Sequence, residues 1–389
     1  MLNDVVLSAI VFVCGAVAGI FVGRWLKLHP GLVAVLIVWH AGFAAYYANY
    51  VLLNGGDAFV YYQKARFDFV APSLGTEFVV WLTSYPVGLG FTYWPTTLLF
   101  NAIGTIGLLF FGAAIRETGV FRLDLRTVRL AALVCLFVPS LSFWTSGIGK
   151  DAIAFLSVGM FVWAAMHFGR RQPAAIAAVL IMFLVRPHIS ALMVLSVAAG
   201  TIFVAQARSA VRFSGAALAT AGAVFAMPLA LSYSGATEFS SITQYLSERQ
   251  EANFEGGSSI DIRGMNPAMR MLSFVYRPLP HEASGIDQLA ASMDNLFLIA
   301  LTVAGLVGLF RASLVEVFQR NSINVIFAIG GIALLSQVTA NLGLASRQKW
   351  MMLPALMIVM LSAWTMANEE RTRKRSKRRS MSGSAQAVR

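Results

Sequence analysis

The chain has few charged residues and few cysteines for its length. Only 12% of its 389 residues are Asp, Glu, Lys or Arg, whereas 58% are hydrophobic. A soluble domain carries about 25% charged residues, because its surface needs polar cover. The composition therefore excludes a soluble globular fold. The two cysteines, Cys14 and Cys135, lie inside apolar runs and predict small buried side chains, not a disulfide framework or a metal site.

Sequence motifs for nucleotide, redox and hydrolytic chemistry are also absent. The chain contains no P-loop, no dinucleotide-binding fingerprint, no zinc motif and no nucleophile elbow. ATP-driven, redox and hydrolase functions therefore lack support, and no cofactor is evident. The participation of a divalent metal stays open.

Apolar runs long enough to span a bilayer recur along the whole chain. They predict an all-α, polytopic integral membrane helix bundle with about eleven transmembrane helices in a single domain, residues 1–367. Residues 368–389 are predicted to form a basic, disordered cytoplasmic tail. The expected spans are Asp4–Gly23, Gly31–Leu53, Phe91–Ile115, one that ends near Ser142, one that begins near Asp151, two within Ala174–Gln206, Gly215–Tyr233, Asn295–Phe310, Ile323–Leu342 and Met351–Ala367.

The pair within Ala174–Gln206 is the least certain division of the chain into helices. Arg186, Pro187 and His188 interrupt this apolar stretch. Either two short helices meet there, or one kinked helix runs through.

Basic residues divide the connecting segments between two faces of the membrane. The inner segments hold 20 of the 30 Lys and Arg residues and only 5 of the 18 Asp and Glu residues. The positive-inside rule then puts the N-terminus outside, the C-terminus in the cytoplasm, and the long loops 54–90 and 234–293 outside. A basic run beside a membrane helix is typical of a topology anchor or an anionic-lipid contact, so we expect no nucleic acid partner.

Six ionisable residues of the outer segments flank or interrupt apolar runs. Charges at membrane depth are costly and therefore mark candidate functional sites, although snorkelling to the headgroups or a structural ion pair is the plain alternative. These residues are Lys150, Asp151, Arg186, His188, Arg347 and Lys349.

A further candidate lies in the first outer segment. Asp57 follows Gly55-Gly56 at the outer end of the second expected helix, and Tyr61 and Tyr62 come shortly after it. Gly-Gly-Asp is good turn chemistry, and a simple turn is the plain alternative. A carboxylate at a cavity mouth can instead take a proton as a general base. The tyrosines would offer an aromatic surface to a sugar ring or a lipid.

Several short segments resemble those of known membrane enzymes. Gly56-Asp57 with Tyr61-Tyr62 and Ala65 resembles the first extracytoplasmic loop of GT-C-type membrane glycosyltransferases. Other segments are similar to those of bacterial polysaccharide-assembly membrane proteins, the O-antigen or exopolysaccharide polymerase type. They are Pro139–Gly147 with Lys150-Asp151, Arg186-Pro187-His188, Tyr276–Ala283 with Arg277 and His281, and Ser346–Trp350 with Pro354. The chain departs from the usual pattern in lacking an acidic pair in the first loop and in having Gln348 where Tyr is common.

The resemblance implies a GT-C-like membrane glycosyltransferase of the bacterial inner membrane. It implies a polyprenyl-phosphate-linked sugar or oligosaccharide donor at the extracytoplasmic face, in cell-envelope polysaccharide biosynthesis. Membrane lipid and polysaccharide-assembly proteins are the implied partners. Asp57 would be the catalytic carboxylate, and Arg and Lys side chains would hold the phosphate leaving group. The implied substrate-binding residues are Tyr61, Tyr62, Lys150, Asp151, Arg186, His188, Arg277, His281, Arg347 and Lys349.

Two other functions stay open at this point. One is a transporter or flippase for a lipid-linked saccharide, and the other is a non-catalytic scaffold of a polysaccharide assembly complex. A transporter is expected to carry its charges near the membrane midplane and to show inverted repeats. In this chain the charges collect at one face and no repeat is evident. A scaffold predicts that Asp57 and Arg186 can be replaced without loss of function.

The predicted topology is open to a labelling test. A cysteine introduced as Ser258→Cys in the second long outer loop should react with a membrane-impermeant maleimide on intact cells, and Ser313→Cys in an inner loop should react only after permeabilisation. Labelling of Ser258→Cys that requires permeabilisation would contradict the topology.

Overall fold

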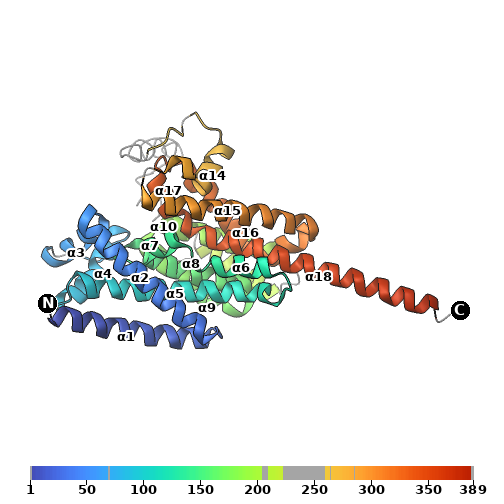
Figure 1. The fold of residues 1–389 in the computed structure, drawn as a ribbon, viewed down its shortest axis with the longest axis horizontal. Coiled ribbons are helices and arrows are strands. Elements are labelled where there is room, and N and C mark those ends of the chain that lie inside the picture. Colours follow the sequence, from blue (N-terminus) through green and yellow to red (C-terminus); the bar gives the residue numbers. More distant parts are fainter. Residues whose placement is uncertain are drawn as a thin grey trace.

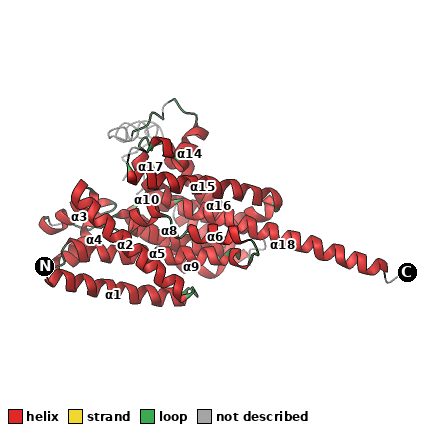
Figure 2. Cartoon of the chain, viewed as in Figure 1, coloured by secondary structure: helices red, strands yellow, loops and turns green. Residues whose placement is uncertain are grey.

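The computed structural model describes residues 2–68, 71–203, 209–221, 259–262, 264–283 and 285–386. These residues form helices joined by short loops (Figures 1 and 2). Extended backbone pairs in the described residues only at an isolated bridge between Ser259 and Asn341. The predicted all-α class is confirmed.

The first half of the chain alternates long helices with short ones. The long helices form the body of the bundle, and the short pair α3 and α4 lies at one end of it (Figure 1). The elements are α1 (Leu2–Trp25), α2 (Pro30–Asn54), α3 (Asp57–Phe67), α4 (Thr76–Gly88), α5 (Tyr93–Glu117), η1 (Val120–Arg122), α6 (Arg126–Val134), α7 (Pro139–Thr145), α8 (Lys150–Met166) and α9 (Phe168–Val185).

The second half packs against the first and ends in one long helix. Of the expected outer loop 234–293, residues 234–258 lie outside the described part, and the remainder forms α14, η3 and the start of α15. The elements are α10 (Pro187–Phe203), α11 (Ser209–Ala221), α14 (Pro267–Tyr276), η3 (Pro280–Glu282), α15 (Ile286–Arg311), α16 (Leu314–Ser336), α17 (Leu342–Gln348), η4 (Lys349–Met351) and α18 (Leu353–Gln386).

Seven described helices are long and apolar enough to cross a membrane, or eight if the bent pair Leu342–Met351 and Leu353–Lys374 forms one span. These eight account for all but three of the eleven expected spans. Two of the three correspond to α8 and α10, whose 17 residues each are at the short end of the range for a span. The third, Gly215–Tyr233, lies largely outside the described residues.

The surface of α1 has the character of a lipid-facing helix. Its side chains Val5, Val13, Val17 and Phe21 are each more than half exposed, and only 11% of its most apolar stretch is buried within the bundle. Such a continuous apolar surface is unfavourable in water and favourable in hydrocarbon. The helix therefore supports an integral membrane protein.

Arg186 ends one helix and Pro187 begins the next. Pro187 lacks an N–H group and disfavours helical geometry at the residue before it, and Arg186 has φ −149° and ψ 78°. The hydroxyl of Ser190 donates to the carbonyl of Val179 over 2.8 Å, although the two residues are 11 positions apart. A straight helix would separate them by roughly 16 Å. The chain therefore turns back here, and the two-helix alternative holds.

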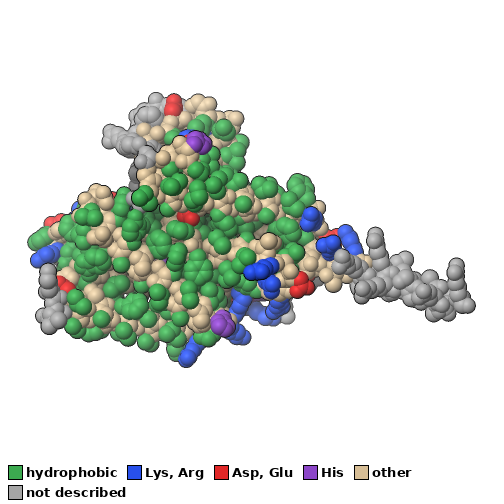
Figure 3. All heavy atoms as spheres, viewed as in Figure 1, with side chains coloured by type: hydrophobic (Ala, Val, Ile, Leu, Met, Phe, Trp, Pro, Cys, Tyr) green, Lys and Arg blue, Asp and Glu red, His purple; other side chains and the backbone are tan. Residues whose placement is uncertain are grey.

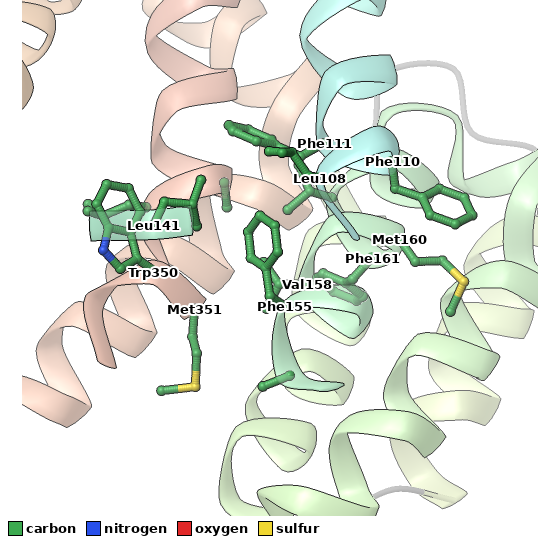
Figure 4. Close-up of a cluster of buried hydrophobic side chains, with 14 of the residues drawn as sticks. Leu108, Phe110, Phe111, Leu141, Phe155, Val158, Met160, Phe161, Trp350 and Met351 are labelled. Atoms are coloured by element: carbon green, nitrogen blue, oxygen red, sulfur yellow. The ribbon is translucent and has the colours of Figure 1, made fainter. Parts of the chain in front are cut away.

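The core lies between α5, α8 and the start of α18. Leu108, Phe111, Phe155 and Phe161 are almost fully buried, and Figure 4 shows these side chains from α5 and α8 facing one another. The two helices approach so closely because glycines face each other. A Cβ at Gly159 would lie 2.2 Å from the carbonyl oxygen of Gly107.

The last helix bends where it enters the bundle. The segment α17–η4 meets α18 at 58°, and α18 then runs through the basic residues as far as Gln386. This helix occupies residues for which composition predicts a disordered tail. Figure 1 shows its C-terminal part leaving the bundle at the end opposite α3.

The close approach of α5 and α8 gives a stability prediction. Gly159→Ala should lower the free energy of unfolding by about 1–3 kcal/mol, because the added methyl group meets backbone that cannot move aside. Thermal unfolding in a mild detergent measures this. Gly42→Ala is the matched control, since a Cβ there meets nothing within 4 Å. Equal melting temperatures for the two variants would contradict the packing of α5 on α8.

Candidate functional site

A buried carboxylate joins three distant parts of the chain. Asp151 is the second residue of α8, and its side chain is 8% exposed. Its Oδ1 accepts a hydrogen bond from Nη2 of Arg186 over 2.7 Å, and its Oδ2 accepts one from Nε of Arg347. A buried charge is strongly unfavourable unless it is paired, so Asp151 requires both guanidinium groups.

Arg347 extends this ion pairing to the surface. It lies in the last turn of α17, and its Nη1 donates to Oδ2 of Asp57 over 2.7 Å. Its guanidinium also lies 5.7 Å from the centre of the Trp144 ring, a cation–π distance. The Asp57 side chain is 54% exposed, so Asp57 is the solvent-facing carboxylate of the site and Asp151 the buried one.

The position of Asp57 follows from two glycines. Gly55 has φ 78° and Gly56 has φ 155°, backbone conformations that favour glycine because it has no Cβ. They end α2 and let α3 begin at once with Asp57. The carboxylate therefore lies at the end of the bundle where Figure 1 shows α3. Gly55, Gly56 and Asp57 therefore form a turn, and Asp57 also lies in the candidate site.

Lys150 brings a third cation to the same place. Its Nζ donates to Oγ1 of Thr76, in the first turn of α4, over 3.0 Å. We call Asp57, Lys150, Asp151, Arg186 and Arg347 the ion-pair cluster. Its three cations and two carboxylates leave one excess positive charge.

One donor of the cluster is unused. The Nε atom of Arg186 is buried and has no hydrogen-bond partner within the described residues. An orphaned charged donor is costly, and a bound anion would satisfy it. Together with the excess positive charge, this atom gives the cluster the character of an anion-binding site.

An apolar cavity of about 300 Å³ borders the cluster. Trp144, whose ring lies against Arg347, and Ser346, which precedes Arg347, are both on its wall. The aromatic side chains Phe43, Tyr46 and Tyr50 of α2 form another wall, at helical spacings that put them on one face. These three aromatic residues are apparent in the sequence, but the same spacing is equally typical of a helix surface that faces lipid. Only the tertiary structure identifies them as a cavity wall.

A buried polar network fixes the helix that carries Trp144. His40, in the middle of α2, is fully buried, and its ring nitrogens lie 2.6 Å from Oδ1 of Asn101 and 3.0 Å from Oγ1 of Thr145. Thr105 contacts the same ring at 3.1 Å. The network ties α2, α5 and the end of α7 together. In the sequence this network is visible only as isolated polar residues within apolar runs.

Lys349 lies away from the ion-pair cluster. Its side chain is 1% exposed, and its Nζ donates to Oδ1 of Asn295, whose Nδ2 donates to the carbonyl of Pro278 over 2.8 Å. Beside Asn295, the carboxylate of Asp294 accepts the backbone N–H of Ser140 over 2.8 Å. These bonds join η4, α15 and the start of α7. Lys349 is therefore placed to hold the segment that carries Arg347.

Arg277 and His281 also lie in a separate arrangement. Arg277 donates to the carboxylate of Glu282, which also accepts the backbone N–H of Leu279 over 2.7 Å. The hydrogen bonds from Arg277 hold the pKa of Glu282 below its usual value. Pro278 of this segment lines the same cavity as Ser346. The Arg277 segment therefore borders the cavity, although the guanidinium itself is paired with Glu282.

The remaining predicted residues lie around the cluster. Tyr61 is buried in α3 with Asp57 and Arg347 in its surroundings, and burial raises the pKa of its phenol. Tyr62 donates to the carbonyl of Phe91 over 3.4 Å and packs edge-on against Tyr93. His188 is exposed at the start of α10. Among the described residues, no three His, Cys, Asp or Glu side chains come together as a metal site would require.

The pairing of Asp151 gives a second stability prediction. Asp151→Asn removes the buried charge that the guanidinium groups of Arg186 and Arg347 share, so we expect the free energy of unfolding to fall by roughly 3–5 kcal/mol. Thermal unfolding in detergent measures the loss. Asp124→Asn, at an exposed position after η1, is the control and should unfold with the wild type. A wild-type melting temperature for Asp151→Asn would show that the ion pairs contribute nothing.

Comparison of the chain with protein-family models, with curated proteins and with solved structures finds no match.

Proposed function

We propose that the chain is a membrane glycosyltransferase that takes its sugar or oligosaccharide from a polyprenyl phosphate or diphosphate. One observation carries the proposal: a net-cationic ion-pair cluster with an exposed carboxylate lies next to an apolar cavity, which it meets through Trp144 and Ser346. A lipid-linked phosphosugar has the same division, with an apolar tail, a charged phosphate and a polar sugar. The resemblance of the Asp57 segment to GT-C enzymes supports the same substrate class.

The cavity suits the lipid part of such a donor. Its volume of about 300 Å³ is that of a small ligand pocket. Its walls from α2, α7, α15 and α17 carry aromatic and aliphatic side chains, and its polar groups are few. Prenyl units nearest the phosphate would pack against Phe43, Tyr46 and Phe143, where their burial is favourable.

The cluster suits the phosphate. Arg347 and Arg186 present planar guanidinium groups, which bind phosphate oxygens in a bidentate manner. The unused Nε of Arg186 is available for such a bond, and Lys150 adds a point charge nearby. These cations would stabilise the negative charge that develops on the leaving phosphate as its bond to the sugar breaks.

Asp57 is the proposed general base. The hydroxyl oxygen of the acceptor attacks the anomeric carbon, the bond from that carbon to the phosphate oxygen breaks, and the phosphate leaves with the electron pair. The hydroxyl proton passes to the carboxylate of Asp57. In the structure the carboxylate of Asp57 accepts a hydrogen bond from Nη1 of Arg347. An arriving phosphate competes for that guanidinium and so releases the base when substrate is bound.

The location of the charges favours transfer over transport. Asp57 and Lys150 are the first residues of α3 and α8, Arg186 lies between two helices, and Arg347 is in the last turn of α17. A transporter binds its substrate near the middle of its spans. Charges at helix ends suit chemistry at the membrane surface. We assign that surface to the extracytoplasmic face of a bacterial inner membrane, because the positive-inside rule puts these helix ends outside.

The base is tested by Asp57→Asn, which keeps the shape of the side chain and removes its charge. We expect transfer activity to fall by about 10²–10⁴-fold while the protein still accumulates in the membrane. The measurement is analysis of lipid-linked sugars in a deletion strain that carries each variant. Accumulated single repeats indicate polymerisation, and a truncated glycan indicates transfer of one sugar.

Asp68→Asn, at the other end of α3, is the matched control and should restore wild-type glycan. Near-normal activity of Asp57→Asn would remove Asp57 from the mechanism. A deletion strain with unchanged glycans and lipid-linked sugars would overturn the transferase function itself.

A further inference from the structure

A second, larger cavity lies at the opposite end of the bundle from Asp57. Its volume is about 720 Å³, and its walls come from α6, α15 and α18. Here α15 ends at Arg311 and α18 leaves the bundle, and Figure 3 shows Lys and Arg side chains gathering toward this end. We call it the basic end. No residue of the ion-pair cluster lines this cavity.

The interior of the cavity is apolar. Leu301 of α15 and Leu361 of α18 are 6% and 0% exposed, and Trp364 of α18 also lines the cavity. On the third side α6 packs through Val128 and leaves its arginine side chains exposed. The groove is therefore lined by hydrocarbon inside and opens where the helices end.

The rim of the cavity is cationic. Arg311, Arg371 and Lys374 surround the opening, with Glu370 as the only carboxylate among the lining residues. Lys374 pairs with Glu370 over 2.6 Å. Arg311 lies 5.7 Å from the centre of the Trp364 ring, which orients its guanidinium over the groove. Three cations and one carboxylate leave two excess positive charges.

We propose that this groove binds an anionic phospholipid, with an acyl chain between α6, α15 and α18 and the phosphate at Arg311 and Arg371. The charge of the rim complements a negative headgroup and gives no advantage to a zwitterionic one. An acyl chain can pack against the apolar interior of the groove, whereas a free phosphate ion has no apolar part to bury there. Basic residues beside membrane helices attract anionic lipids generally, and here a built cavity adds a place for the chain.

The site is tested on the purified full-length protein in a neutral detergent, by native mass spectrometry during titration with dioleoyl phosphatidylglycerol. Arg311→Gln, Arg371→Gln and Lys374→Gln combined should weaken the first lipid adduct on the order of 100-fold. The matched control combines Arg24→Gln, Arg170→Gln and Arg320→Gln, three exposed cations outside the groove. The control should leave that adduct nearly unchanged, and dioleoyl phosphatidylcholine should bind the wild type far more weakly.

A second variant separates the groove from simple surface charge. Ala304→Phe fills the cavity from α15 without changing any charge, so it should also reduce the phosphatidylglycerol adduct. Excess inorganic phosphate should leave the adduct in place, because the acyl chain holds the lipid. An equal loss in both triple variants, full binding by Ala304→Phe, or displacement by phosphate would each overturn the proposal. If the charge variant cannot be purified, Ala304→Phe decides alone.

Discussion

The packing of the helix ends that carry the ion-pair cluster depends on one buried carboxylate. Asp151 lies 35 positions from Arg186 and 196 positions from Arg347, yet it accepts hydrogen bonds from both. None of these charges is stable in an apolar interior without its partner. The start of α8, the turn between α9 and α10, and the end of α17 must therefore meet. Arg347 also pairs with Asp57, so the buried carboxylate holds the guanidinium group that the exposed carboxylate contacts.

Two further polar networks support this arrangement. His40 joins α2, α5 and α7, and so fixes Trp144 beside Arg347. Lys349 joins η4 to α15 through Asn295, and so fixes the bend that precedes α18. Inside an apolar bundle each satisfied polar contact is strong, and each unsatisfied one is costly. The networks therefore hold helix ends in register that hydrophobic packing alone would leave free to slide.

The two ends of the molecule differ in the chemistry that they offer. In the ion-pair cluster two carboxylates accompany the cations, and one of them, Asp57, is exposed. At the basic end, cations outnumber carboxylates around an apolar groove, and the lining carboxylate of Glu370 is paired with Lys374. The first arrangement is the basis of the proposed transferase site, and the second is the basis of the proposed lipid site. Both proposals rest on the same principle, that a charged rim beside an apolar groove favours an amphipathic anion.

The sequence by itself determined the helical class and the interruption of an apolar stretch at Arg186-Pro187, because these depend on local composition and on the geometry of proline. Of the eleven spans that it predicted, seven or eight are long apolar helices in the described residues, and only the fold showed that two helices meet at Arg186. The sequence also marked Asp57, Lys150, Asp151, Arg186 and Arg347 as unusual charges. Only the tertiary structure decided their partners. It paired Arg277 with Glu282 and Lys349 with Asn295, away from the cluster, and it turned an aromatic stripe of α2 into a cavity wall. A helix forms from contacts within a few residues, whereas an ion pair between residues 196 positions apart depends on how whole helices pack.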